Sequence, residues 1–165
     1  VLVPDGASMI DRRMGLYGHP LDIQSLFYAA LKTSSELLVP NQENQTIITA
    51  VYARLNPLLR QLRDNYWIDT DRLNVIYRFQ VEEYGEKAFN QFNIYSDSIP
   101  FYRLAKWLPE AAGYLAGNLG PSQLDCRFFS IGNLMAVLAS LTDEEQSHKI
   151  LNLIELRWGD LIGHM

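Results

Sequence analysis

Hydrophobic residues recur at helical spacing in two stretches near the start of the chain. The first follows Pro20, which suits the opening turn of a helix, and its apolar positions continue to Leu38. Its apolar face is wide, which is typical of a helix contacted on more than one side. The second stretch, residues 43–67, has a single apolar stripe and predicts a helix with one exposed face. Pro57 lies inside it and should kink this helix or divide it in two.

The middle of the chain has a weaker pattern. A helix start at Asp69-Thr70-Asp71 should continue for two or three turns, whereas residues 80–100 have no steady period and are expected to be irregular. A short helix is expected over residues 100–108. Two short strands, 113–117 and 127–129, are expected to pair as a hairpin.

The last part of the chain is again helical. Residues 131–141 are apolar with few charges and predict an interior helix. Thr142 and Glu145 have the spacing of a capping box, and the final helix carries apolar residues on one face as far as Ile162. A broad apolar helix followed by a one-sided helix therefore occurs twice. This alternation predicts an all-α fold that is part of an (α/α)6 barrel, with a short β-hairpin near 113–129.

Length and composition limit what the chain can be. The 165 residues are 48% hydrophobic, which suffices for one core, but a ring of twelve helices needs roughly 200 residues. The valine start and the end within a helical pattern predict that residues 1–165 are the central segment of one domain, with N- and C-terminal parts missing. The net charge of −5 argues against a nucleic-acid binder, and no apolar run is long enough to cross a membrane. Cys126 is the only cysteine, which favours a reducing compartment.

A polar stretch, residues 5–20, precedes the first broad helix. It places two carboxylates, two guanidiniums, a phenol and an imidazole among three glycines, and no apolar period predicts a helix or strand there. A carboxyl group in such surroundings can act as a general acid or base. A surface loop whose Asp and Arg side chains pair with each other fits the composition equally well. The polar residues are Asp5, Asp11, Arg12, Arg13, Tyr17 and His19.

A second polar stretch, residues 123–129, precedes the second broad helix. Asp125 and Arg127 lie beside Phe128 and Phe129, and these residue types suit a sugar site. In the alternative interpretation, Asp125 pairs with Arg127 and the two rings belong to the core. Because both polar stretches precede a broad helix, both are expected to open at the same end of a helical toroid. The histidines lack metal-ligand spacing, and no nucleotide-binding motif is present.

The stretch Asp-Gly-Ala-Ser-Met-Ile-Asp-Arg-Arg-Met-Gly-Leu-Tyr-Gly-His-Pro, residues 5–20, resembles a signature of the alkaline/neutral invertases. These are the cytosolic sucrose-hydrolysing glycosidases of cyanobacteria and plants. The resemblance covers essentially the whole chain. It continues through Ile23–Tyr28, Asn65–Asp69, Phe92–Tyr95, Gly113–Leu119, Asp125–Leu134 and Asp143–Ile150.

The resemblance implies an (α/α)6 barrel that hydrolyses sucrose with inversion, without metal or cofactor, in a cytoplasmic enzyme that forms homo-oligomers when full length. It implies that Asp11 is the catalytic acid, with Asp5 as the second choice, and that the base lies outside this chain. It further implies a set of residues that bind sugar hydroxyls or orient the acid. These are Asp5, Arg12, Arg13, Tyr17, His19, Gln24, Asp125 and Arg127.

Two other functions also fit the sequence. Another inverting (α/α) glycosidase, such as one resembling a trehalase, would share the scaffold. A helical interaction module without catalytic activity is the second alternative. The isolated 165 residues are expected to be inactive because they lack the base, and poorly soluble because an open ring exposes the flanks of its interior helices.

Overall fold

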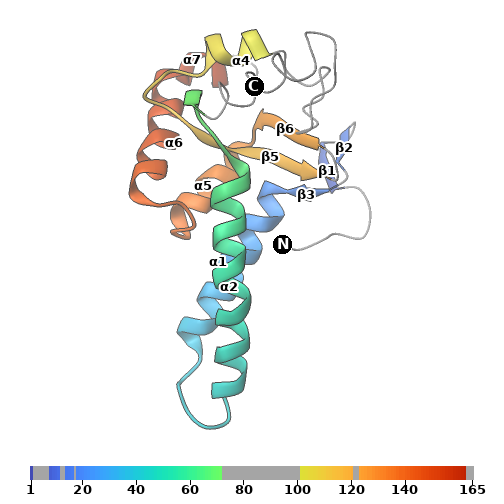
Figure 1. The fold of residues 1–165 in the computed structure, drawn as a ribbon, viewed down its shortest axis with the longest axis vertical. Coiled ribbons are helices and arrows are strands. Elements are labelled where there is room, and N and C mark those ends of the chain that lie inside the picture. The colour runs from blue at the N-terminus through green and yellow to red at the C-terminus, as the bar shows by residue number, and fades with distance from the viewer. Residues whose placement is uncertain (2–7, 12–13, 17, 72–100, 121–122, 163–165) are drawn as a thin grey trace.

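The computed structural model describes residues 1, 8–11, 14–16, 18–71, 101–120 and 123–162, which form helices around a small antiparallel sheet (Figure 1). The helices are α1 (Leu21–Leu37), α2 (Gln45–Tyr66), α4 (Phe101–Trp107), α5 (Ser130–Leu138), α6 (Glu144–Leu156) and α7 (Trp158–Ile162). The strands are β1 (Ser8–Asp11), β2 (Met14–Leu16), β3 (His19–Pro20), β4 (Trp67–Ile68), β5 (Tyr114–Gly120) and β6 (Gln123–Phe128). In this described part, no helix is long and apolar enough to cross a membrane.

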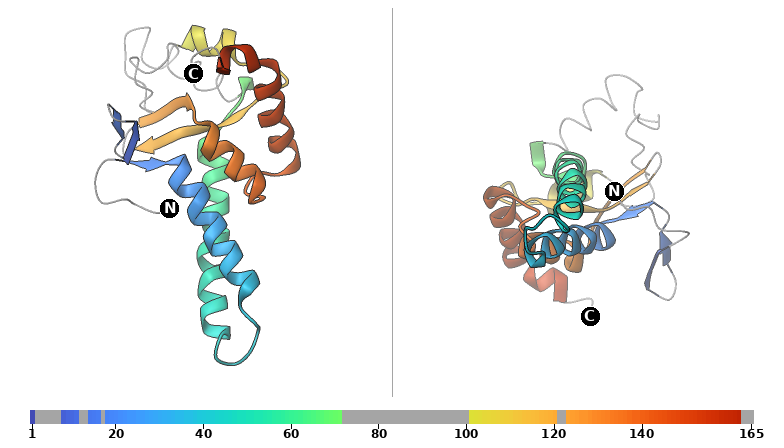
Figure 2. Two further views of the ribbon diagram at one scale, coloured as in Figure 1. Left: turned by 180° about the vertical axis from the view of Figure 1, so that it is seen from behind. Right: turned by 90° about the horizontal axis from the view of Figure 1, so that it is seen from below.

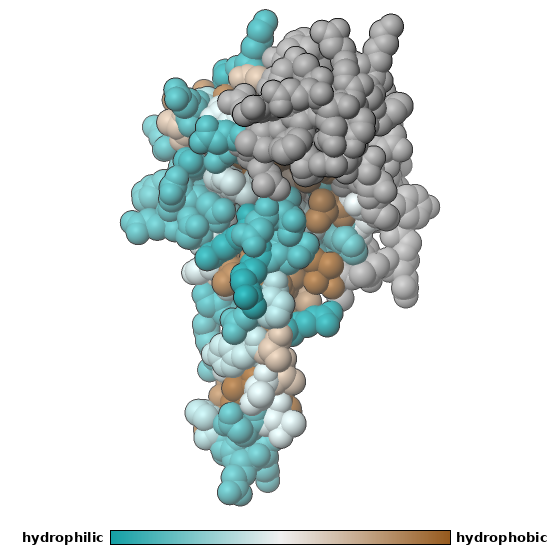
Figure 3. Space-filling view, viewed as in Figure 1, coloured by the Kyte–Doolittle hydropathy of each residue, from teal (hydrophilic) through white to brown (hydrophobic). Residues whose placement is uncertain are grey.

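Helices α1 and α2 form an antiparallel hairpin that extends away from the sheet (Figures 1 and 2). Helix α1 contacts both α2 and α5, as its wide apolar face predicted. Helix α2 is a single helix with Pro57 inside it, so of the two predicted effects Pro57 does not divide the helix. Pro57 is exposed, so its ring faces solvent rather than a neighbouring helix. The outer half of the hairpin leaves apolar side chains exposed among polar ones, as the lower part of Figure 3 shows; they include Leu37, Ile47 and Tyr52.

Strand β5 is the centre of the sheet. It pairs antiparallel with β6, which confirms the predicted hairpin, although both strands are longer than expected. It also pairs antiparallel with β3 and β4, which the sequence did not predict. These two strands have only two residues each, too few to show the alternation that marks a strand. The all-α expectation is therefore corrected to a mainly helical fold with a small sheet.

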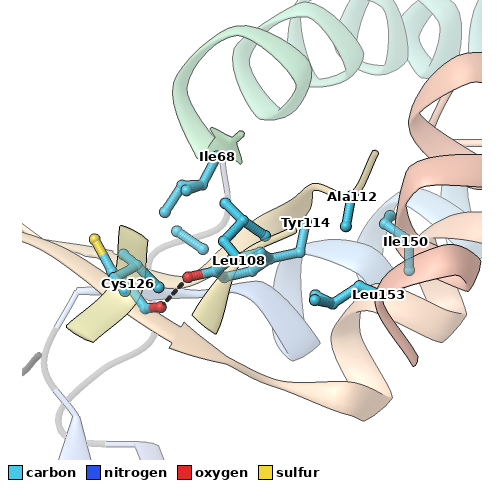
Figure 4. Packing of buried hydrophobic residues seen from close by; sticks show 9 residues of the cluster. Ile68, Leu108, Ala112, Tyr114, Cys126, Ile150 and Leu153 are labelled. Atoms are coloured by element: carbon cyan, nitrogen blue, oxygen red, sulfur yellow. Dashed lines mark hydrogen bonds between the residues drawn. The ribbon is translucent and has the colours of Figure 1, made fainter. Parts of the chain in front are cut away.

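Strand β5 supplies side chains to two buried clusters. Tyr114 and Ala116 belong to a cluster that includes Ile150 and Leu153 of α6 (Figure 4). Leu115, which lies between them, belongs to a second cluster around α1 and α2. Because successive side chains of a strand point to opposite faces, β5 joins the two clusters. The second cluster contains Leu21, Tyr28, Leu55, Leu58, Leu62, Tyr66, Leu115, Ala136 and Leu141.

Helix α5 packs its first turn closely against α1. A Cβ atom added at Gly132 would lie 2.4 Å from Asp22 Oδ1 and 2.8 Å from Leu21 Cγ. The opposite side of α5 leaves Ile131 and Leu138 exposed, so the described residues bury only one side of this helix. Its expected interior position in a barrel therefore remains a prediction, as does the barrel itself.

Replacing Gly132 with alanine should destabilise the fold by about 1–3 kcal/mol, because the added methyl group overfills a packed contact that includes the Asp22 backbone nitrogen. Denaturant-induced unfolding of the full-length protein measures this cost. Gly159→Ala is the matched control, since no atom lies within 4 Å of its added Cβ. In helix α7 that alanine should be neutral or stabilising by up to about 1 kcal/mol. Equal midpoints for the two variants would contradict the packing argument.

The C-terminal helices differ in detail from expectation. The capping box of α6 is formed by Asp143 and Gln146, one residue later than the predicted pair, because the Thr142 hydroxyl bonds to Ser147 instead. The predicted single final helix is also wrong, since α6 and α7 are separated at Arg157. The guanidinium of Arg157 donates to the carbonyl of Trp107 at 2.7 Å and therefore holds the end of α4.

Helix α4 confirms the short helix expected near residues 100–108. The expected continuation of a helix after Asp69-Thr70-Asp71 and the irregular region 80–100 fall largely or wholly outside the described residues.

Candidate functional site

The proposed catalytic carboxylate belongs to a short β-hairpin. Asp11 ends β1 and pairs with Met14 of β2, and the register shifts between Met9 and Asp11. The expectation that this stretch is neither helix nor strand is therefore wrong, because cross-strand pairing does not require an apolar period. Asp11 lies at the turn end of the hairpin. Four other predicted site residues lie outside the described residues: Asp5, Arg12, Arg13 and Tyr17.

Gly18 connects this hairpin to the sheet. Its φ of +125° is unfavourable for other residues, and a Cβ atom there would lie 2.7 Å from Gly120 Cα. The next residue, His19, pairs with Leu119 of β5, and its carbonyl accepts a hydrogen bond of 2.6 Å from the Tyr66 hydroxyl. The hairpin that carries Asp11 is thus attached to the sheet through β3, and the buried Tyr66 side chain helps to hold β3 in place.

Strand β6 carries the second set of predicted site residues. Cys126 is buried in the first cluster, with Leu124 and Phe128 packed against that cluster. Asp125 and Arg127 alternate with them along the strand and therefore project from its other face. The two polar side chains remain partly accessible, with exposed fractions of 11% and 27%.

Asp125 and Arg127 form a bidentate ion pair. The Arg127 Nε atom lies 2.9 Å from both carboxylate oxygens, and a terminal guanidinium nitrogen contacts Oδ2 as well. The hydrogen bonds that Arg127 donates to Asp125 raise the pKa of Arg127, and the guanidinium carbon lies 5.6 Å from the centre of the Phe129 ring. The structure therefore shows the pairing that the sequence left as an alternative. A role in sugar binding stays a prediction for both residues.

The sheet brings the two polar stretches together. Asn118 of β5 pairs with Pro20 on one side and with Asp125 on the other, and His19 occupies the next row. Neighbouring strands lie about 4.8 Å apart, so β3 and β6 are separated by roughly 10 Å. Gln24, also predicted to bind substrate, is fully buried in α1. Its substrate role likewise stays a prediction.

Asp22 is a residue whose role sequence reasoning missed. Its carboxylate lies against Gly132 of α5, and burial raises its pKa. Its Oδ1 atom has no hydrogen-bond partner in the described part of the chain. Since Asp22 is in the first turn of α1 and Gly132 in the first turn of α5, it joins the helices that follow the two polar stretches. An acidic residue in the first turn of a helix is the sequence feature that could have drawn attention to Asp22.

Buried amides were missed as well. Asn118 is 3% exposed and Asn133 is fully buried, and each interrupts an otherwise apolar segment, which could have singled them out. Within the described ranges, no group of three or more His, Cys, Asp or Glu side chains could hold a metal ion.

These features define a mainly helical fold in which two polar stretches meet across a small sheet. Comparison with known protein families identifies the family of this chain. The family model described as "Alkaline and neutral invertase" matches residues 1–165, and the chain belongs to this family. The resemblance seen in the sequence is thereby confirmed.

Several relatives match the complete chain. It is 50% identical to "Neutral/alkaline invertase 1, mitochondrial" of Oryza sativa subsp. japonica, covering 26% of that protein. It is 47% identical to "Probable alkaline/neutral invertase A, chloroplastic" of Arabidopsis thaliana, covering 26% of it. It is 44% identical to "Cytosolic invertase 1" of Oryza sativa subsp. japonica, covering 29%. The chain thus spans between a quarter and a third of the length of these relatives.

The comparisons correct one expectation from the sequence. A cytoplasmic location was inferred from the family resemblance, but relatives named mitochondrial and chloroplastic match this chain at 50% and 47% identity. The inference is wrong because members of the family are not confined to the cytoplasm.

Proposed function

We propose that this chain is part of the catalytic domain of an invertase that hydrolyses sucrose to glucose and fructose. The observation that carries the proposal is the family match over all 165 residues, with relatives named as invertases. The remainder of the domain would complete an (α/α)6 barrel. It would also contribute the catalytic base, and the full-length protein would form a homo-oligomer.

The proposed reaction is an inverting hydrolysis. Asp11, protonated, donates its proton to the oxygen that links the two sugars as the bond to glucose breaks. A carboxylate from the rest of the protein removes a proton from a water molecule, which attacks the glucose carbon from the opposite face. Inverting enzymes keep the two carboxyl groups about 6.5–9.5 Å apart to leave space for that water.

The described geometry of strand β6 supports a sugar-binding role for this part of the sheet. The Asp125 carboxylate and the Arg127 guanidinium present acceptors and donors in a fixed arrangement, with the Phe129 ring against the guanidinium. His19 is in β3, on the other side of β5 from β6, in the row of Leu119 and Leu124 next to the row of Asp125. We infer that these residues bind sucrose hydroxyls, together with Asp5, Arg12, Arg13, Tyr17 and Gln24.

A substrate assay of the full-length protein tests the proposal. Sucrose should be hydrolysed, trehalose should not, and proton NMR should detect β-glucose as the first-formed anomer, because inversion changes the α configuration of the glucosyl group in sucrose. Hydrolysis of trehalose alone would favour the trehalase-like alternative. Hydrolysis of neither sugar would favour an interaction module. The isolated 165 residues should show no activity, since they lack the base.

A further inference from the structure

Two buried phenols contact the strands that carry the proposed sugar-binding residues. Tyr66, at the end of α2, donates a hydrogen bond of 2.6 Å to the carbonyl of His19 in β3. Tyr114, at the start of β5, donates to the carbonyl of Cys126 in β6 (Figure 4). Cys126 lies between Asp125 and Arg127. Each phenol therefore holds the backbone at or next to a residue proposed to bind substrate.

Both tyrosines belong to the core and not to the polar surface. Each is fully buried, Tyr66 in the second cluster and Tyr114 in the first. Burial raises the pKa of both phenols, so that they stay protonated and keep their hydrogen-bond donors at neutral pH. Their rings are held by packing, and the hydroxyl positions are set by the two clusters.

The two hydrogen bonds act on strands that are not paired with each other. Strands β3 and β6 each pair with β5, but β3 contributes only two residues to that pairing. So short a strand is weakly held by its own backbone bonds, which makes an added bond from Tyr66 important for its position. The pairing of β5 with β6 is irregular, because the register shifts between Ala116 and Asn118 of β5. The Cys126 carbonyl that accepts from Tyr114 lies in the part of β6 opposite this shift.

We propose that Tyr66 and Tyr114 are positioning residues that fix the backbone of β3 at His19 and the backbone of β6 between Asp125 and Arg127, and so determine how tightly sucrose is held. This inference rests on the proposed function. The tyrosines themselves do not touch the substrate. Their effect passes through the backbone of β3 and β6 to side chains that do.

The test compares three Tyr→Phe variants of the full-length enzyme. Tyr66→Phe and Tyr114→Phe each remove one donor, and each should lower kcat/KM for sucrose about tenfold, mainly by raising KM, because the affected residues bind ground state and transition state alike. Tyr28→Phe is the matched control. Tyr28 is 5% exposed and lies in the same cluster as Tyr66, but in the described part of the chain its hydroxyl bonds to neither β3 nor β6. Its kcat/KM should change less than about twofold, within the ordinary range for a substitution away from a site.

A purely structural role predicts a different result. All three variants would then lose thermal stability, and the kcat and KM of the folded enzyme at a temperature well below unfolding would stay the same. That result would overturn the proposal, as would a change in KM confined to one of the two phenols. Failure of the wild-type enzyme to hydrolyse sucrose would instead remove the proposed function itself.

A donor-retaining variant covers the case in which a phenylalanine variant does not fold. Incorporation of 4-aminophenylalanine at position 66 or 114 keeps the ring and an N–H donor at the same place. It should keep KM within about threefold of the wild-type value, since an N–H group also donates to a carbonyl oxygen. A folded amino variant with KM raised tenfold would show that the hydrogen bond is not what positions the strand.

Discussion

Replacing Asp11 with asparagine in the full-length protein should lower kcat for sucrose hydrolysis by about 10²–10⁴-fold, because the variant lacks the proton that we propose Asp11 donates to the leaving oxygen. Asparagine has nearly the same shape and keeps an acceptor oxygen, so the β1–β2 hairpin should form as before. KM should change little. Steady-state kinetics with sucrose, together with circular dichroism of the purified variant, measure both expectations.

Two further Asp→Asn variants test whether the loss of activity is specific to Asp11. Asp143→Asn is the matched control, since Asp143 is exposed at the N-terminus of α6 and asparagine is an equally good capping residue. It should retain wild-type kcat. Asp5→Asn tests the second-choice acid. If Asp5→Asn lost activity by orders of magnitude while Asp11→Asn retained most of it, the assignment of the acid would pass to Asp5.

The largest effect on stability is expected at Asn133. Its amide bonds to both backbone groups of Leu115 in β5: Oδ1 accepts from the Leu115 N–H at 2.8 Å, and Nδ2 donates to the Leu115 carbonyl at 3.0 Å. Nδ2 also donates to the Phe129 carbonyl at 2.9 Å. Replacing Asn133 with alanine leaves the buried Leu115 N–H and carbonyl without this partner, whereas the Phe129 carbonyl keeps its bond from the Asn133 backbone N–H. We expect a loss of about 2–4 kcal/mol, since each unsatisfied buried group costs about 1–3 kcal/mol.

Denaturant-induced unfolding of the full-length protein measures this loss. Asn65→Ala is the matched control, because the Asn65 amide donates to the Gln61 carbonyl of its own helix in an exposed setting. It should change stability by less than about 0.5 kcal/mol. A similar midpoint for both alanine variants would show that the Asn133 amide does not hold α5 to β5.

Parts of the fold could be read from local pattern. The starts of α1 and α2 lie within two residues of their predicted positions because their apolar residues repeat with the period of a helix. The β5–β6 hairpin was predictable because its strands are close in sequence. Strands β3 and β4 were not, since each is two residues long and pairs with a segment nearly fifty or a hundred residues away.

The candidate site, too, was predictable from the sequence only in part. The sequence singled out Asp11, Asp125 and Arg127 by residue type and by family resemblance. It did not decide whether Asp125 and Arg127 pair with each other, because neighbours along a chain can point together or apart. The structure shows that they pair on one face of β6, since the residues between and beside them belong to the core.

By itself, the sequence determined the helical segments, the β5–β6 hairpin and the membership of the invertase family, because periodicity and motif are properties of residues near one another in the chain. Only the tertiary structure decided that Tyr66, Tyr114 and Asn133 hold the backbone around the candidate site. Their partners lie 47, 12 and 18 residues away, and a buried phenol or amide reveals its role only when the fold shows which carbonyl or N–H it meets.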